Sequence, residues 1–216
     1  VISNETKEKI IDIRTAQQRI AYILRGVMDV STIDAKNIKI VKNQYKVANL
    51  LTEITLRSKQ ESKEKGLEFR TNFDEAIPEI LYGDSIRLKQ IINALISNAI
   101  KYTKQGFVEL SVNSIVSFDV CRLVISVKDS GIGVNAEEIN KLFQSKTDEN
   151  DISDKVDESN VTLDVAKKMV NLIGGTITVR SEKNKGSEFT LIVDQRIASS
   201  NGKIDKIINE YKKTED

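Results

Sequence analysis

The most informative absence in this chain of 216 residues is histidine, of which there is none. Without an imidazole, these residues contain no histidine acid–base catalyst, no histidine metal ligand and no site for a phosphohistidine. A composition rich in lysine, isoleucine and asparagine also makes histidine scarce by chance. The absence therefore excludes certain chemistry but indicates no function by itself.

The chain also has only one cysteine, no long apolar run and a net charge close to zero. The single Cys121 excludes an internal disulfide, and its place in the apolar stretch VCRLVISV fits a reducing compartment. No apolar run reaches about 18 residues and no signal-peptide pattern opens the chain, so no membrane span is predicted. With 33 Lys and Arg against 32 Asp and Glu, interleaved along the chain, no nucleic-acid surface is expected. These features predict a cytoplasmic segment, whose parent protein could still be membrane-anchored.

Three parts are expected along the chain. Residues 1–40 carry helical periodicity, because apolar residues recur at steps of three and four while the opposite positions are charged. This pattern predicts a long amphipathic helix that packs on a partner, as a satellite of the core or as half of a bundle or coiled-coil dimer. Residues 41–196 are the expected main domain, and residues 197–216 an expected charged tail or linker. Because the chain opens on VISNETKEKI without a methionine, we expect it to be part of a longer protein.

Helical and strand patterns alternate within the main domain. The segment KVANLLTEITLRSKQESKEKGL predicts an amphipathic helix that ends at Gly66. Runs of alternating or β-branched residues predict strands at residues 67–73, 107–116, 122–129, 175–181 and 187–194. Apolar residues at three- and four-residue steps predict two more helices, at residues 88–103 and 161–173. Hairpins with helices between them predict an α/β (α+β) two-layer sandwich, with one mixed sheet and its helices on one face.

The predicted helix LKQIINALISNAIKYT, residues 88–103, carries polar amides among its apolar residues. At about 100° per residue, one face that should pack on the sheet is formed by Leu88, Ile92, Leu95 and Ala99. Ala94, Asn98 and Lys101 fall on a stripe along the edge of that face. An amide and an ammonium one turn apart could hold an anion or a hydrated cation. Asn98 could equally be a solvated boundary residue that bonds locally, and the helix alone leaves both interpretations open.

A second polar motif, DSGIG, follows a predicted strand. Asp129 ends the strand, and Gly131 and Gly133 follow at two-residue spacing. Glycines let a backbone approach a ligand closely or adopt a positive φ, and a carboxylate can accept a hydrogen bond from an exocyclic amine. A tight turn gives the same pattern. Gly186 and Ser187, which precede the last predicted strand, likewise indicate only a turn when taken alone. The motif is neither a dinucleotide-binding fingerprint nor a P-loop.

Taken in order, three stretches resemble the ATP-binding domain of sensor histidine kinases. That domain has the Bergerat (GHKL) fold, largely antiparallel, which is shared with gyrase B, MutL and the heat-shock chaperones. The stretch GDSIRLKQIINALISNAIKYT is similar to the N-box, DSGIG to the first glycine box, and NLIGGTITVRSEKNKGSEFTL to the segment with the last glycine box. Upstream, QRIAYILRGVMDVSTIDAKNIKI resembles the second helix of the dimerisation and phosphotransfer domain. The resemblance covers residues 5–195.

The resemblance implies a role for each matching residue. Asn98 would ligate a Mg²⁺ ion that bridges the phosphates, as a hard oxygen donor for a hard cation. Lys101 would neutralise phosphate charge, and Tyr102 would flank the nucleotide. Asp129 would accept a hydrogen bond from the adenine amino group. The other implied nucleotide-binding residues are Gly131, Ile132, Gly133, Thr162, Leu163 and Thr190. Residues 134–160 would be a mobile ATP lid.

Several positions depart from the family pattern. The N-box usually has a second Asn one turn before the Mg²⁺ ligand, where this chain has Ala94, and hydrolytic relatives carry their water-activating glutamate there. Asn160 and Thr162 replace the two glycines of the second glycine box, whose amides wrap phosphates at a helix N-terminus. Thr162 could instead cap that helix. The lid segment KLFQSKTDENDISD is rich in acidic residues that would repel a triphosphate.

These features lead to a specific expectation. The chain would be the ATP-binding catalytic module of a two-component sensor histidine kinase, which passes a phosphoryl group from ATP to a histidine outside this chain, with impaired nucleotide binding. The alternatives are a pseudokinase scaffold for dimerisation and recruitment, an active kinase whose lid uses other residues, and a pure interaction module. The resemblance implies ATP and Mg²⁺ as cofactors. It also implies a homodimer through the N-terminal helices, with a response regulator or receiver domain as partner.

Overall fold

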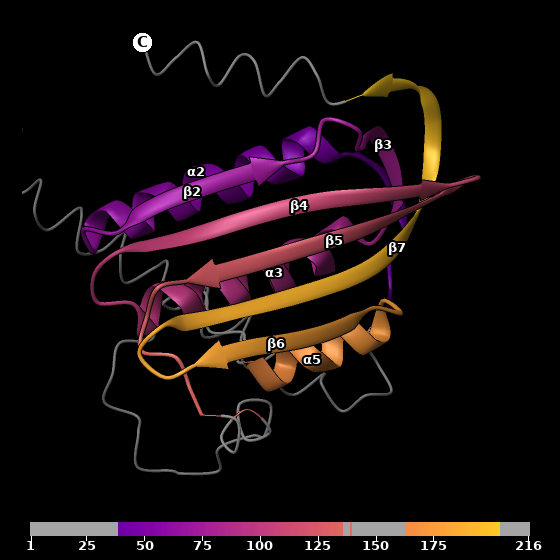
Figure 1. The fold of residues 1–216 in the computed structure, drawn as a ribbon. Coiled ribbons are helices and arrows are strands. Elements are labelled where there is room, and N and C mark those ends of the chain that lie inside the picture. Colours follow the sequence, from indigo (N-terminus) through magenta and orange to yellow (C-terminus); the bar gives the residue numbers. More distant parts are fainter. Residues whose placement is uncertain (1–38, 136–138, 140–162, 204–216) are drawn as a thin grey trace, which may run out of the picture. The chain divides into compact units, whose positions relative to one another are not determined.

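A seven-stranded sheet with helices on one face forms the described part of the chain (Figure 1). The computed structural model describes residues 39–135, residue 139 and residues 163–203. Its elements are β1 (Asn43–Lys46), α2 (Val47–Glu64), β2 (Glu68–Phe73), β3 (Pro78–Gly83), α3 (Ser85–Tyr102), β4 (Phe107–Ser117), β5 (Val120–Asp129), α5 (Leu163–Leu172), β6 (Thr176–Glu182) and β7 (Gly186–Lys203).

The strands follow the order β1-β3-β7-β5-β4-β2, and β6 pairs with β7. The long strand β7 links the parts of this sheet, because its first half lies between β5 and β6 and its last residues pair with β3. Among the described strands, β2 and β4 run parallel and every other pair is antiparallel. The predicted mixed, largely antiparallel sheet is confirmed.

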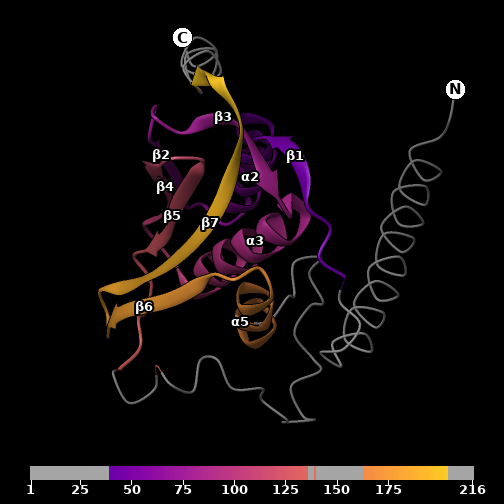
Figure 2. The same cartoon turned by 90° about the vertical axis from the view of Figure 1, so that its right-hand side faces the viewer.

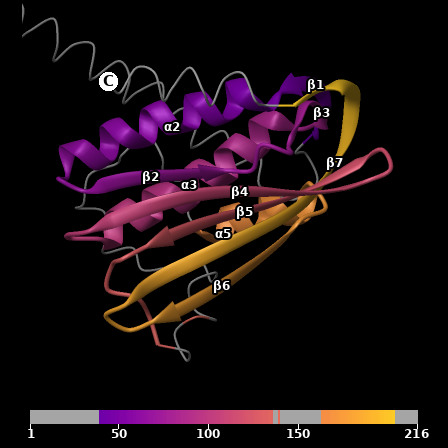
Figure 3. The ribbon, with the colours of Figure 1, turned by 45° about the horizontal axis from the view of Figure 1, so that its top comes forward.

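Helices α2, α3 and α5 cover the same face of the sheet (Figure 2). Figure 3 shows the opposite face of β2, β4, β5, β7 and β6, which no described helix covers. The buried side of α3 includes the four residues predicted for it, Leu88, Ile92, Leu95 and Ala99. The predicted two-layer arrangement is therefore confirmed for the described residues.

Local capping signals set the helix ends. Gly66, with φ of 70°, follows α2 where the sequence predicts its end. Asp84 caps α3, because its Oδ1 accepts a hydrogen bond from the Arg87 N–H at 3.0 Å. Its Oδ2 accepts another from the Val41 N–H at 3.0 Å, so the same carboxylate fastens the start of the domain to α3.

Alternating side chains fill the space between sheet and helices. Strand β5 buries one residue in two, Cys121, Leu123, Ile125 and Val127, each at most 1% exposed. Burying an aliphatic side chain of this size contributes roughly 1.5–3 kcal/mol, so this strand is firmly anchored in the core. Its ten residues pair with β4 on one side and β7 on the other. The end of β5 is therefore a rigid place for a functional residue.

The structure differs from the sequence prediction in two short strands, β1 and β3, and in the C-terminal end of the long strand β7. β1 (NQYK) and β3 (PEILYG) were not predicted, because the first is polar and the second starts with proline, so neither shows clear alternation. β7 runs on to Lys203, seven residues past the expected domain end at 196. The polar segment IASSNGK carries little strand signal of its own, and it becomes a strand by pairing with β3.

Parts of the expected organisation lie outside the described residues. These are the amphipathic helix expected within residues 1–40 and the charged segment after residue 203. Within the described part of the chain, no helix is long and apolar enough to cross a membrane.

Cys121 should be chemically inert while the protein is folded. Burial raises the pKa of its thiol to about 11, so little thiolate forms at pH 8, and the side chain is fully covered. We expect a disulfide reagent to label native protein at least about 100-fold more slowly than urea-unfolded protein. Labelling at equal rates in both states would contradict this burial.

Candidate functional site

Asp129, the last residue of β5, is a buried carboxylate with 4% of its surface exposed. Its Oδ1 accepts a hydrogen bond from the Gly131 N–H at 2.8 Å. Burial raises the pKa of Asp129 above its ordinary value, and backbone hydrogen bonds from Gly131 and Ser187 oppose that rise. A carboxylate offers about four acceptor positions, so Asp129 has capacity for a further hydrogen bond from a ligand amine.

The two glycines after Asp129 let other segments come closer than a side chain would allow. A Cβ at Gly131 would lie 2.5 Å from the carbonyl oxygen of Tyr102 and 2.8 Å from Oδ1 of Asp129. Gly133 has φ of 56°, and a Cβ there would lie 2.1 Å from the carbonyl oxygen of Glu182. DSGIG is therefore more than a local turn, because its glycines pack against two distant segments.

The end of α3 is one of those segments. The carbonyl oxygen of Tyr102 accepts a hydrogen bond from the Ile132 N–H at 3.3 Å, which joins α3 directly to DSGIG. Asn98 lies one turn earlier on this helix and is half-buried. Lys101 and Tyr102 are exposed, with the Lys101 Nζ 5.6 Å from the centre of the Tyr102 ring. The structure thus brings the predicted N-box and first-glycine-box residues together.

Asn98 has the chemistry of a Mg²⁺ ligand. Its half-buried amide makes no hydrogen bond to another residue that the structure describes. Mg²⁺ in phosphate sites keeps several waters and takes phosphate oxygens, so one amide oxygen from the protein suffices. The described residues hold no cluster of three or more His, Cys, Asp or Glu that could bind a metal. Ala94, one turn earlier and 3% exposed, offers no second ligand.

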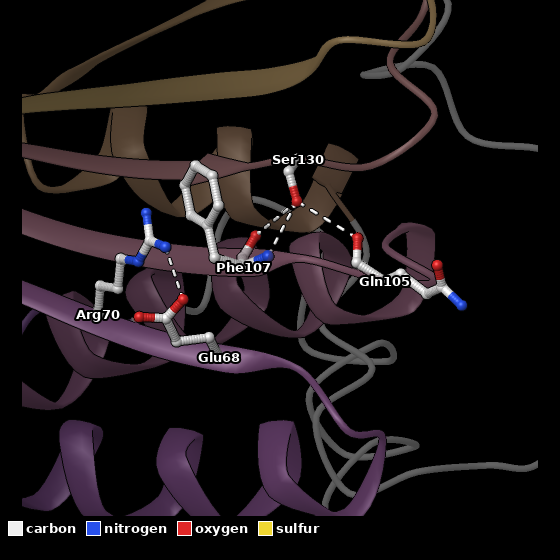
Figure 4. A network of polar contacts seen from close by, with 5 residues as sticks. All are labelled: Glu68, Arg70, Gln105, Phe107 and Ser130. Atoms are coloured by element: carbon white, nitrogen blue, oxygen red, sulfur yellow. Dashed lines mark hydrogen bonds and ion pairs between the residues drawn. The ribbon is translucent and has the colours of Figure 1, made fainter.

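Ser130 ties the end of β5 to the start of β4 (Figure 4). Its Oγ accepts a hydrogen bond from the Phe107 N–H at 2.9 Å and lies 3.3 Å and 3.4 Å from the carbonyl oxygens of Phe107 and Gln105. Beside it, the Arg70 guanidinium lies 4.2 Å from the centre of the Phe107 ring and pairs with Glu68 at 2.6 Å. The Ser130 contacts hold the loop between α3 and β4 in place next to the site.

The β6–β7 hairpin is the other segment that packs against DSGIG. The Asn184 N–H donates a hydrogen bond to the carbonyl oxygen of Ile132 at 2.7 Å. The Val134 N–H donates to the Ser181 Oγ at 2.8 Å. The start of β7 is equally close, since a Cβ at Gly186 would lie 1.9 Å from the Asp129 carbonyl oxygen. Three distant parts of the chain therefore converge at the end of β5.

The structure brings Ser187, not the predicted Thr190, to this site. Ser187 lies directly opposite Asp129 in the pairing of β7 with β5. Successive strand residues face opposite sides, and Phe189 and Leu191 are buried in the core, so Thr190 points to the helix-free face. The alternation in SEFTLIVD could have placed Ser187 on the same side as the site. The nucleotide-binding role of Thr190 stays a prediction.

The remaining predicted residues lie around the second glycine box. Leu163 begins α5, is half-buried and packs against the core. Thr162 and Asn160 lie outside the described residues, as does the expected lid apart from residues 134, 135 and 139. Their contribution to the site stays a prediction.

Residues 83–197 match the sequence profile of the family described as histidine kinase-, DNA gyrase B-, and HSP90-like ATPase. The chain belongs to this ATPase family. Among its relatives, the signal transduction histidine-protein kinase BarA of Escherichia coli (strain K12) is 28% identical over 185 residues, covering 85% of this chain and 20% of BarA. The sensory/regulatory protein RpfC of Xanthomonas campestris is 27% identical over 188 residues, covering 86% of this chain and 26% of RpfC.

Solved histidine kinases share the fold. Full-length ShkA in complex with AMPPNP aligns with a TM-score of 0.71 at 21% identity, over 93% of this chain and 41% of ShkA. The histidine kinase AdeS of Acinetobacter baumannii aligns with a TM-score of 0.61 at 16% identity, over 92% of this chain and 87% of that structure. The GHKL fold and the resemblance to sensor histidine kinases are confirmed. The chain spans about a fifth to a quarter of BarA and RpfC.

The raised pKa of Asp129 predicts a pH-dependent effect of Asp129→Asn. A carboxyl whose folded-state pKa is raised contributes stability that is fully present below its unfolded-state pKa, near 3.9, and is lost as the pH rises through the folded-state pKa. The substituted amide would keep an oxygen for the Gly131 N–H but carry no charge. We therefore expect the variant to melt at a higher temperature than wild type at pH 7 and the difference to shrink toward pH 4. A variant less stable than wild type at pH 7 would show that the ionised carboxylate supports the fold.

Proposed function

We propose that residues 40–203 are the ATP-binding catalytic module of a two-component sensor histidine kinase, which serves phosphoryl transfer from ATP to a histidine outside this chain. One observation carries this proposal. The buried Asp129 lies where α3, DSGIG and the β6–β7 hairpin meet, and its carboxylate can accept a hydrogen bond from the amino group of an adenine. A buried carboxylate held by rigid elements favours a base that presents a hydrogen-bond donor to it. A base without that donor would leave the carboxylate without a hydrogen bond, which costs free energy.

The residues of α3 would act on the phosphates. Asn98 would hold Mg²⁺ through its amide oxygen, and that ion would supply charge neutralisation between the phosphate groups. Lys101 would add a positive charge near them, and Tyr102 would flank the nucleotide. Transfer of this kind depends mainly on positioning and electrostatic stabilisation, so the fixed geometry of α3 against DSGIG is what the protein contributes.

The same site is proposed to bind nucleotide weakly. Ala94 is buried and cannot supply the polar group that this helix position has in the family. In the sequence, Asn160 and Thr162 replace two glycines whose amides would wrap phosphates, and the acidic residues within 141–154 would oppose a triphosphate. If binding is lost altogether, the domain would be a pseudokinase scaffold. Ala94 is the described residue that most favours this second candidate.

The partners of the parent protein follow from the same interpretation. Homodimerisation would use the N-terminal helices, and a response regulator or receiver domain would receive the phosphoryl group. The parent protein would work in the cytoplasm, with or without a membrane anchor. These proposals rest on the family and on the relatives, which include proteins described as hybrid histidine kinases.

Calorimetric titration with Mg²⁺·ATP tests the proposed function. We expect binding in the micromolar to millimolar range, and Asn98→Ala should weaken Mg²⁺·ATP at least about tenfold while metal-free ATP binding changes little. Asn93→Ala is the matched control, since Asn93 is half-buried on the same helix but lies about 140° around the helix axis from Asn98. Absence of heat and of a thermal shift at millimolar nucleotide would leave only the scaffold function. Equal losses in both variants would remove Asn98 from the site.

Restoring the glycines tests the proposed weakness. Asn160→Gly combined with Thr162→Gly should tighten Mg²⁺·ATP binding by about tenfold, because backbone amides could then close on the phosphates. Binding of adenosine, which has no phosphates, should not change. Unaltered ATP affinity would show that these two side chains do not limit the site.

A further inference from the structure

Ser181 of β6 makes an unusual set of hydrogen bonds for a strand residue. Its Oγ accepts from the Val134 N–H at 2.8 Å, donates to the Gly186 carbonyl oxygen at 3.1 Å and lies 3.0 Å from the Ser187 Oγ. A serine hydroxyl has one hydrogen and two acceptor positions. Only one assignment of donors and acceptors fits all three contacts. The Val134 N–H and the Ser187 hydroxyl donate to the Ser181 Oγ, and the Ser181 hydroxyl donates to the Gly186 carbonyl oxygen.

The position would otherwise be apolar. On β6 the half-buried residues alternate as Ile177, Val179 and Ser181, and the first two pack against the core. The hairpin does not depend on the serine for its closure, because the Lys185 N–H bonds the Glu182 carbonyl oxygen at 3.0 Å. A hydroxyl on the core side of this strand therefore indicates a role in contacts outside the hairpin.

The partners of Ser181 belong to two parts of the candidate site. Val134 directly follows Gly133, so this bond fixes the chain as it leaves DSGIG, 47 residues away in sequence from Ser181. Ser187 lies directly opposite Asp129 in the pairing of β7 with β5, so a bond that orients Ser187 also holds the strand that faces Asp129. One hydroxyl thus connects the exit of the glycine motif to the strand that faces Asp129.

We propose that Ser181 is a positioning residue of the nucleotide site, which holds the Gly133–Val134 backbone and the start of β7 in register with Asp129. The proposal rests on the proposed nucleotide binding for its functional half. Its structural half concerns the protein without any ligand. Without the hydroxyl, the Val134 N–H and the Gly186 carbonyl oxygen would each lose a partner, and the segment from 132 to 134 would open more often.

Amide hydrogen exchange of the nucleotide-free chain tests the structural half. In Ser181→Ala, we expect the Val134 amide to exchange at least about tenfold faster, while amides in the middle of β5 keep their protection. Ser181→Thr keeps the hydroxyl and should restore slow exchange at Val134. Thr178→Ala is the matched control, because Thr178 lies on the same strand but is exposed on the other face. Unchanged exchange at Val134 in the alanine variant would overturn the proposal.

Titration with Mg²⁺·ATP tests the functional half on the same four proteins. We expect Ser181→Ala to weaken binding by about tenfold, and Ser181→Thr and Thr178→Ala to bind like wild type. If wild type binds and Ser181→Ala binds equally well, the positioning role is wrong. If wild type binds no nucleotide, the proposed function fails, and hydrogen exchange alone then decides whether Ser181 holds this segment.

Discussion

The burial of one carboxylate governs how this domain is built around its candidate site. Asp129 sits at the end of a strand whose other inward residues are core aliphatics and Cys121, and burial alone works against its charge. Backbone N–H groups from Gly131 and Ser187 offset part of that cost. The segments that carry these donors approach Asp129 so closely that a Cβ at Gly131 or Gly186 would clash with it. DSGIG and the β6–β7 hairpin are therefore packed closely around the buried Asp129.

The remainder of the fold keeps those segments in register. The antiparallel pairing of β5 with β4 and β7 fixes the strand end, and the packed face of α3 fixes Tyr102 against Ile132. Asn98 and Lys101 then lie on the last two turns of a helix that cannot slide. The end of β5 would thereby recognise the base, and α3 would bind the phosphates and the metal. Rigid packing joins these two elements. Such separation allows phosphate-gripping residues to change while the fold and the base site persist.

Sequence patterns predicted the features that depend on local periodicity. The buried face of α3 and the hairpins were confirmed, since each follows from a strong repeat, and the ordered motifs of the N-box and DSGIG meet in the structure. Strands β1 and β3 and the end of β7 escaped prediction because pairing partners far along the chain create them. Motif matching pointed to Thr190, whereas strand alternation puts Ser187 on the inner face opposite Asp129. The Ser181 bonds could not be predicted, because nothing local signals a partner 47 residues away.

Base selectivity tests the central claim most directly, because the ratio of ATP to GTP affinity depends on the group that faces the base, whereas the phosphates are the same in both nucleotides. Adenine presents an amino group as a donor at the position where guanine presents an acceptor oxygen. A buried carboxylate facing that position should therefore accept ATP and reject GTP. We expect competition titrations with Mg²⁺ to give at least about 100-fold tighter binding of ATP than of GTP. Equal affinity for the two nucleotides, or binding of neither at millimolar concentration, would contradict the account.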